Sequence, residues 1–64
     1  MLNEQQIKDI ENKLDHCSEI YYSTSNRETR ELNRGTCQGI AFVLDKLGYS
    51  VEWDNGKAII VEND

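Results

Sequence analysis

Residues 27 to 47, RETRELNRGTCQGIAFVLDKL, contain the only long apolar run of the chain, Ile40-Ala41-Phe42-Val43-Leu44. As a helix, this segment places apolar side chains on one broad stripe, which predicts its core face. The stripe consists of Leu32, Thr36, Ile40, Val43, Leu44 and Leu47. Phe42 falls on the opposite side together with Gly35 and Gly39, so the helix is apolar on two sides and is expected to lie between two neighbours.

Gly35 and Gly39 are four residues apart, which places both on nearly the same side of the helix. Each glycine costs about 1 kcal/mol in a helix relative to alanine. The missing side chains would let another backbone approach closely. Two neighbours fit this surface: the β-hairpin of the same chain, which is the simpler interpretation, or a second subunit. The segment is too short and too interrupted by charge to span a bilayer.

A first helix is predicted from about residue 4 to residue 22. Asn3 is its expected N-cap, with Gln6 completing a capping box and with Leu2 and Ile7 spaced as a hydrophobic staple. Apolar positions then recur at steps of three and four along one seam, formed by Ile7, Ile10, Leu14, Cys17 and Tyr21. This helix is expected to contact one partner.

A second helix is predicted from about residue 26 to residue 47, with Ser25 and Glu28 forming its capping box. The two helices then make an antiparallel hairpin, which brings Cys17 and Cys37 to the same level. We interpret both cysteines as small buried hydrophobic residues. A redox-active or disulfide-bonded pair is the alternative.

A β-hairpin is predicted over about residues 49 to 61, because alternating strands flank Asn55-Gly56, the preferred pair for a type I′ turn. Gly48 suits the left-handed position that ends the second helix. The inner face pairs Trp53 with Ala58 and Val51 with Ile60, and the outer face pairs Glu52 with Ile59 and Ser50 with Val61. The fold class is therefore α+β, a helical hairpin followed by a two-stranded β-hairpin in one domain over residues 1–64.

Length and charge limit the partners of this chain. A core built from 64 residues is marginal, so we expect a homodimer or a higher oligomer. Twelve acidic against seven basic residues give a formal net charge of -5, which argues against general nucleic-acid binding and against anionic membranes. The N-terminus has neither the basic start nor the apolar segment of a signal peptide, so a cytoplasmic location is expected.

The outer face of the predicted β-hairpin is the first candidate binding surface. Ile59 and Val61 make this face half apolar, and both strands are open edges unless another chain pairs with them. With the exposed side of the second helix, this predicts a partner-binding set of Ile59, Val61, Glu52 and Phe42.

Three arginines, Arg27, Arg30 and Arg34, lie along one side of the first two turns of the second helix, where positive charge opposes the helix dipole. Their guanidinium groups could bind phosphates or carboxylates, with Tyr21 and Tyr22 as stacking surfaces. The simpler interpretation is a solvated, salt-bridged face, because Glu31 follows Arg27 by four residues.

The sequence contains no catalytic motif. His16 points away from the seam that holds Cys17, so His16, Cys17 and Cys37 are not expected to bind one metal ion. Zinc also usually requires four ligands. We therefore expect no enzyme activity, no metal and no cofactor.

These observations predict a small, acidic, non-enzymatic binding protein. The preferred form is a phage- or prophage-type inhibitor that occludes a host defence or regulatory protein by direct contact. The alternative is an oligomeric binder that sequesters a small anionic ligand, such as a nucleotide, through the arginine stripe.

Overall fold

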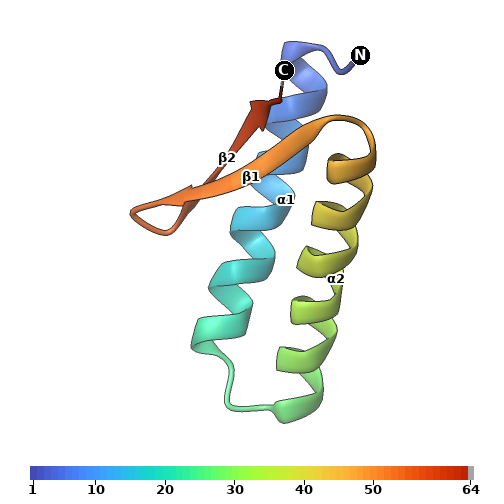
Figure 1. Ribbon diagram of the computed structural model, residues 1–64. Helices are drawn as coiled ribbons and strands as arrows, with labels where there is room; N and C mark the ends of the chain where they lie inside the picture. Colours follow the sequence, from blue (N-terminus) through green and yellow to red (C-terminus); the bar gives the residue numbers. More distant parts are fainter. Residues whose placement is uncertain (64) are drawn as a thin grey trace.

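Two helices and a β-hairpin follow one another along the chain in the computed structural model, which describes residues 1–63 (Figure 1). The elements are α1 (Glu4–Ser23), α2 (Arg27–Lys46), β1 (Tyr49–Asp54) and β2 (Lys57–Glu62). This order confirms the predicted α+β fold. Asp64, the last residue of the predicted domain, lies outside the described residues.

Side-chain caps decide where both helices begin. Asn3 Oδ1 accepts a hydrogen bond from the backbone N–H of Gln6 at 2.7 Å, and Gln6 Oε1 accepts one from the N–H of Asn3 at 2.9 Å. The predicted capping box of α1 is thus confirmed. The prediction that Ser25 caps α2 is wrong: Asn26 precedes the first helical residue, and its Oδ1 accepts from Thr29 N–H at 2.9 Å. Serine and asparagine are about equally favourable at the N-cap, so residue preference alone did not distinguish Ser25 from Asn26.

The β-hairpin has the predicted register. Asn55 and Gly56 have positive φ angles of 52° and 79°, as a type I′ turn requires. Trp53 pairs with Ala58 and Val51 with Ile60 on one face, while Glu52 pairs with Ile59 on the other. A two-residue turn therefore sorts the apolar residues of both strands onto the two predicted faces.

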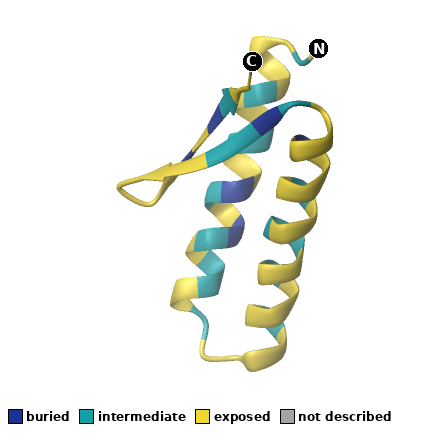
Figure 2. Ribbon diagram, viewed as in Figure 1, coloured by how far each residue is buried: buried dark blue, intermediate teal, exposed yellow. Residues whose placement is uncertain are grey.

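The β-hairpin lies across one end of the antiparallel helix pair, and the core is located there (Figures 1 and 2). The core centre consists of Leu44, Tyr49 and Ile60. Partly buried side chains packed against this centre are Leu2, Ile7, Ile10, Ile40 and Val51. Leu14, Cys17 and Ala58 are also buried. The connection between α1 and α2 is at the opposite end, which the strands do not reach.

Hydrogen bonds from α1 and from Tyr49 attach the hairpin to the helical layer. The carboxylates of Asp15 and Glu11 accept from the N–H groups of Ala58 at 2.7 Å and Ile60 at 2.9 Å. The Tyr49 hydroxyl accepts from the N–H of Leu2 at 3.1 Å. Both strands are edges of this two-stranded sheet, as predicted, but on β2 the carboxylates accept from two outward N–H groups.

The predicted core stripe of α2 is buried only in part. Leu44 is buried and Ile40 is half-buried, but the exposed fractions of Leu32, Val43 and Leu47 are 71%, 55% and 58%. The prediction that these three residues face the core is wrong. The stripe covers a wide arc of the helix, and α1 and β1 contact only the part that holds Ile40 and Leu44.

The predicted contact between the α2 glycines and the hairpin of the same chain is also wrong. A Cβ atom added at Gly35 or at Gly39 would meet no neighbouring atom within 4 Å. The hairpin crosses the other side of α2, so both glycines border open space.

Candidate functional site

An open groove of about 670 Å³ lies between α1 and α2. We call it the apolar groove. Its main lining residues are Leu2, Ile10, Gly35, Gly39, Val43 and Leu47. No residue of β1 or β2 lines the apolar groove, so it lies on the face of the helical layer that the hairpin leaves uncovered. The sequence showed that α2 is apolar on two sides, but it did not indicate that α1 completes a groove there.

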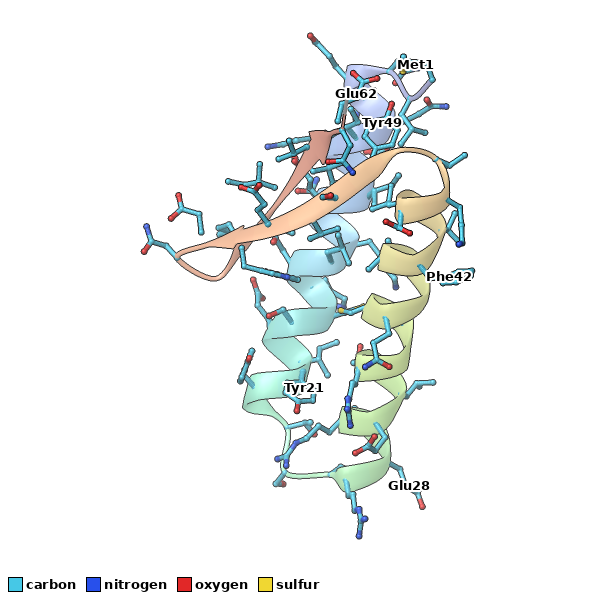
Figure 3. All side chains as sticks on the ribbon, viewed as in Figure 1. Met1, Tyr21, Glu28, Phe42, Tyr49 and Glu62 are labelled. Carbon is cyan, nitrogen blue, oxygen red and sulfur yellow. The ribbon has the colours of Figure 1, made fainter. Side chains whose placement is uncertain are left out.

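Phe42 extends from α2 on the side remote from the hairpin (Figure 3). Its side chain is 63% exposed, and Lys46 Nζ lies 5.2 Å from the centre of its ring. The predicted partner-binding set grouped Phe42 with Ile59, Val61 and Glu52. The structure places these three residues on the hairpin and separates Phe42 from them.

The outer hairpin face has an apolar centre with a polar border. Ile59 is 41% exposed and Val61 is half-buried, with Glu52 paired opposite Ile59. Ser50, which pairs with Val61, exchanges hydrogen bonds with the Asn63 side chain at 2.8 and 3.0 Å. The turn of the hairpin extends beyond the helical layer (Figure 1), which leaves this face open to a large partner.

A second concavity of about 300 Å³ is lined by three aromatic residues and one arginine. We call it the aromatic cleft, and its principal residues are Tyr21, Tyr22, Trp53 and Arg34. The tyrosine rings meet edge to face with centres 5.0 Å apart. The cleft thus brings together three residues of the predicted anion site and adds Trp53. Trp53 was not predicted at this site, because strand alternation assigned it to the core face.

The arginine stripe is not one continuous site. Arg30 Nη2 donates to the backbone oxygen of Thr24 at 2.9 Å, and the guanidinium lies 6.0 Å from the Tyr21 ring centre. Arg34 lies 3.8 Å from the Glu31 carboxylate. Arg27 is exposed in the first turn of α2 and does not line the aromatic cleft. Only Arg34 of the three therefore reaches the cleft.

The two cysteines are neighbours across the helix pair. Both are free thiols, with Cys17 buried and Cys37 half-buried. Partial burial, together with the adjacent Cys17 thiol, raises the pKa of the Cys37 thiol above its ordinary value. This environment favours the protonated, less nucleophilic form.

The described residues form neither a metal-ligand cluster nor a membrane-spanning helix. Among residues 1–63, no three side chains of His, Cys, Asp or Glu gather as metal ligands would. Neither α1 nor α2 is long and apolar enough to cross a membrane.

Comparison with known proteins gives no relative for this chain. No protein-family model, curated protein sequence or solved structure matches it.

Proposed function

We propose that this protein is a non-enzymatic binding protein that covers a surface of a partner protein with the outer face of its β-hairpin. The observation that carries the proposal is the apolar centre formed by Ile59 and Val61 on a hairpin that extends beyond the helices. Protein interfaces commonly combine an apolar centre with a polar rim, and Glu52 and Ser50 supply that rim. We further propose a phage-type inhibitor that acts on a host defence or regulatory protein in the cytoplasm.

The attachment of the hairpin supports this role. Asp15 and Glu11 bind β2 from the side of α1, so the outer face is held on a rigid support. A preorganised surface loses less conformational entropy when it binds. The hairpin can therefore present Ile59 and Val61 without refolding.

The test begins with affinity capture from host lysate and continues with titration of the purified partner. We expect Ile59→Glu to weaken binding at least about thirtyfold, because a charge would lie at the centre of an apolar contact. The matched control is Glu19→Lys on the exposed face of α1, which should bind normally. Circular dichroism must show that both variants fold. Unchanged affinity of folded Ile59→Glu would exclude the hairpin as the binding surface.

The aromatic cleft supports a second candidate function, the binding of a nucleotide. Tyr21, Tyr22 and Trp53 offer ring faces for a base, and Arg34 offers a guanidinium for a phosphate. Trp53 is the single tryptophan of the chain, so its fluorescence would report a ligand in the cleft.

The test of this second function is a titration with a nucleoside triphosphate. We expect a saturable change in Trp53 fluorescence, which Arg34→Gln should weaken by about tenfold or more, since a charge-assisted hydrogen bond is lost. Arg27→Gln is the control, because Arg27 lies outside the cleft. An absent or non-saturable signal up to millimolar nucleotide would remove this function and leave the protein-binding proposal intact.

A further inference from the structure

We propose that a second copy of this chain occupies the apolar groove, with the two α2 helices antiparallel, so that the protein is a twofold-symmetric dimer. This inference goes beyond the proposed function, because it concerns the helical face opposite the hairpin. Three independent observations support it: the order of residues along α2, the charges beside the groove and the size of the exposed surface.

The side of α2 toward the apolar groove, continued to the C-cap Leu47, has the same spacing in both directions. It is formed by Leu32, Thr36, Gly39, Ile40, Val43 and Leu47, and these positions are symmetric about the point between residues 39 and 40. An antiparallel pairing about that point sets Leu32 against Leu47 of the second copy and Thr36 against Val43. A twofold interface requires such a self-complementary surface.

Glycines also border the groove. Gly35 and Gly39 both line it from α2. Antiparallel pairing about the point between residues 39 and 40 sets Gly39 of each copy against Ile40 of the other. The open space beside both glycines admits this close approach.

The charges beside the groove match the same arrangement. Glu31 and Lys46 lie on the flank of α2 that also carries Phe42, as helical spacing requires. In the antiparallel pair, Lys46 of each copy comes within two residues, about 3 Å along the helix axis, of the level of Glu31 of the other. Within one chain, Glu31 reaches only Arg34, at 3.8 Å with both side chains more than half exposed. The carboxylate is therefore available to the second copy.

The whole chain exposes more surface than a folded monomer of its mass usually does. The chain has an accessible surface of 4863 Å², against about 4200 Å² expected for a folded monomer of this mass. The excess of roughly 650 Å² approaches the ~800 Å² that each partner buries in an interface of standard size. Because no strand residue lines the apolar groove, the dimer leaves both hairpins free.

The first experiment measures mass by light scattering and sedimentation equilibrium from 1 to 100 µM protein. We expect a dimer, and we expect Val43→Asp to raise the dissociation constant at least about hundredfold, because the symmetry introduces two charges into the interface. Val43 is more than half exposed, so the monomer should still fold. The matched control, Ile59→Glu on the hairpin, should remain dimeric.

A charge exchange tests the orientation. Glu31→Lys and Lys46→Glu should each weaken the dimer by about tenfold at low salt, since each creates two like-charge contacts. The double variant should recover the original affinity within about threefold. A monomer at 100 µM, a dimer broken by Ile59→Glu but not by Val43→Asp, or a double variant no tighter than the single ones would each overturn the proposal.

Discussion

Two carboxylates of α1 determine how the β-hairpin meets the helices. Asp15 and Glu11 are four residues apart on the helix, a rise of about 6.0 Å. The N–H groups that they bind, on Ala58 and Ile60, are two residues apart on the strand, or about 6.6 Å. The two spacings match, so adjacent turns of α1 bind alternate residues of β2. These contacts also satisfy two N–H groups of an edge strand that would otherwise be free to pair with another chain.

The Asp15 contact is testable by stability. We expect Asp15→Ala to lower the free energy of unfolding by about 1 to 2 kcal/mol, because the backbone N–H of Ala58 loses a charged acceptor. Asp15→Asn should cost less, since its amide oxygen still accepts a hydrogen bond. Urea denaturation followed by circular dichroism measures both. Glu19→Ala, on the exposed face of α1, is the control and should change stability by less than about 0.5 kcal/mol. Equal losses at the two positions would contradict the role given to Asp15.

The raised pKa of Cys37 makes a second prediction for a single residue. Only the thiolate is alkylated rapidly, so iodoacetamide should modify Cys37 more slowly in the folded protein than in urea at pH 8. Peptide mapping by mass spectrometry distinguishes Cys37 from Cys17. The fold favours the protonated Cys37 thiol. The contribution of this thiol to the free energy of unfolding is therefore complete below its unfolded-state pKa and is lost as pH rises through its folded-state pKa. Faster labelling in the folded state would refute this assignment.

At the scale of elements, the hairpin was predictable and the orientation of α2 was not. Asn55-Gly56 sets a two-residue turn, and that turn alone decides which of Val51, Glu52 and Trp53 faces the helices. For α2, apolar residues spread over more of the helix than one neighbour can cover. The sequence therefore identified an apolar helix without showing that Leu44 faces the core while Val43 faces solvent.

The candidate sites also divide into those that could be predicted from the sequence and those that could not. Ile59 and Val61 were placed correctly on the outer face because strand alternation has a period of two. The aromatic cleft was missed in part, since it joins Tyr21, Arg34 and Trp53 from three elements. The periodic pattern of one helix or strand does not predict which side chains of different elements come together. The carboxylate contacts of α1 were missed for the same reason.

The turn of the hairpin provides a prediction at this scale. Gly56 has φ +79°, a conformation that costs an L-amino acid about 1 to 2 kcal/mol. We expect Gly56→Ala to destabilise the hairpin by that amount, with faster hydrogen exchange at the paired residues of β1 and β2. Asn55→Gly is the matched control, because glycine also adopts positive φ. Normal exchange in Gly56→Ala would show that the turn does not control the register.

At the scale of the whole molecule, the core is concentrated at one end of an elongated shape. The principal extents are 38, 21 and 17 Å. The buried residues Leu44, Tyr49 and Ile60 form the core cluster where the hairpin meets the helices, whereas no strand covers the helices near the connection between α1 and α2. An end formed by the helix pair alone buries little apolar surface, so local opening there should cost less free energy than opening at the core.

Hydrogen exchange followed residue by residue tests this gradient and the proposed dimer together. We expect the slowest amide exchange around Leu14 and Leu44, and the fastest helical exchange near Ser23 and Arg27, where α1 ends and α2 begins. If a second copy covers the apolar groove, protection across residues 35–46 of α2 should increase with protein concentration, because association stabilises only the covered surface. The connection between the helices lies outside that surface, so its exchange should stay constant and serves as the internal control. Uniform protection along both helices would contradict the gradient, and concentration-independent protection in α2, at concentrations spanning the dissociation constant, would contradict the dimer.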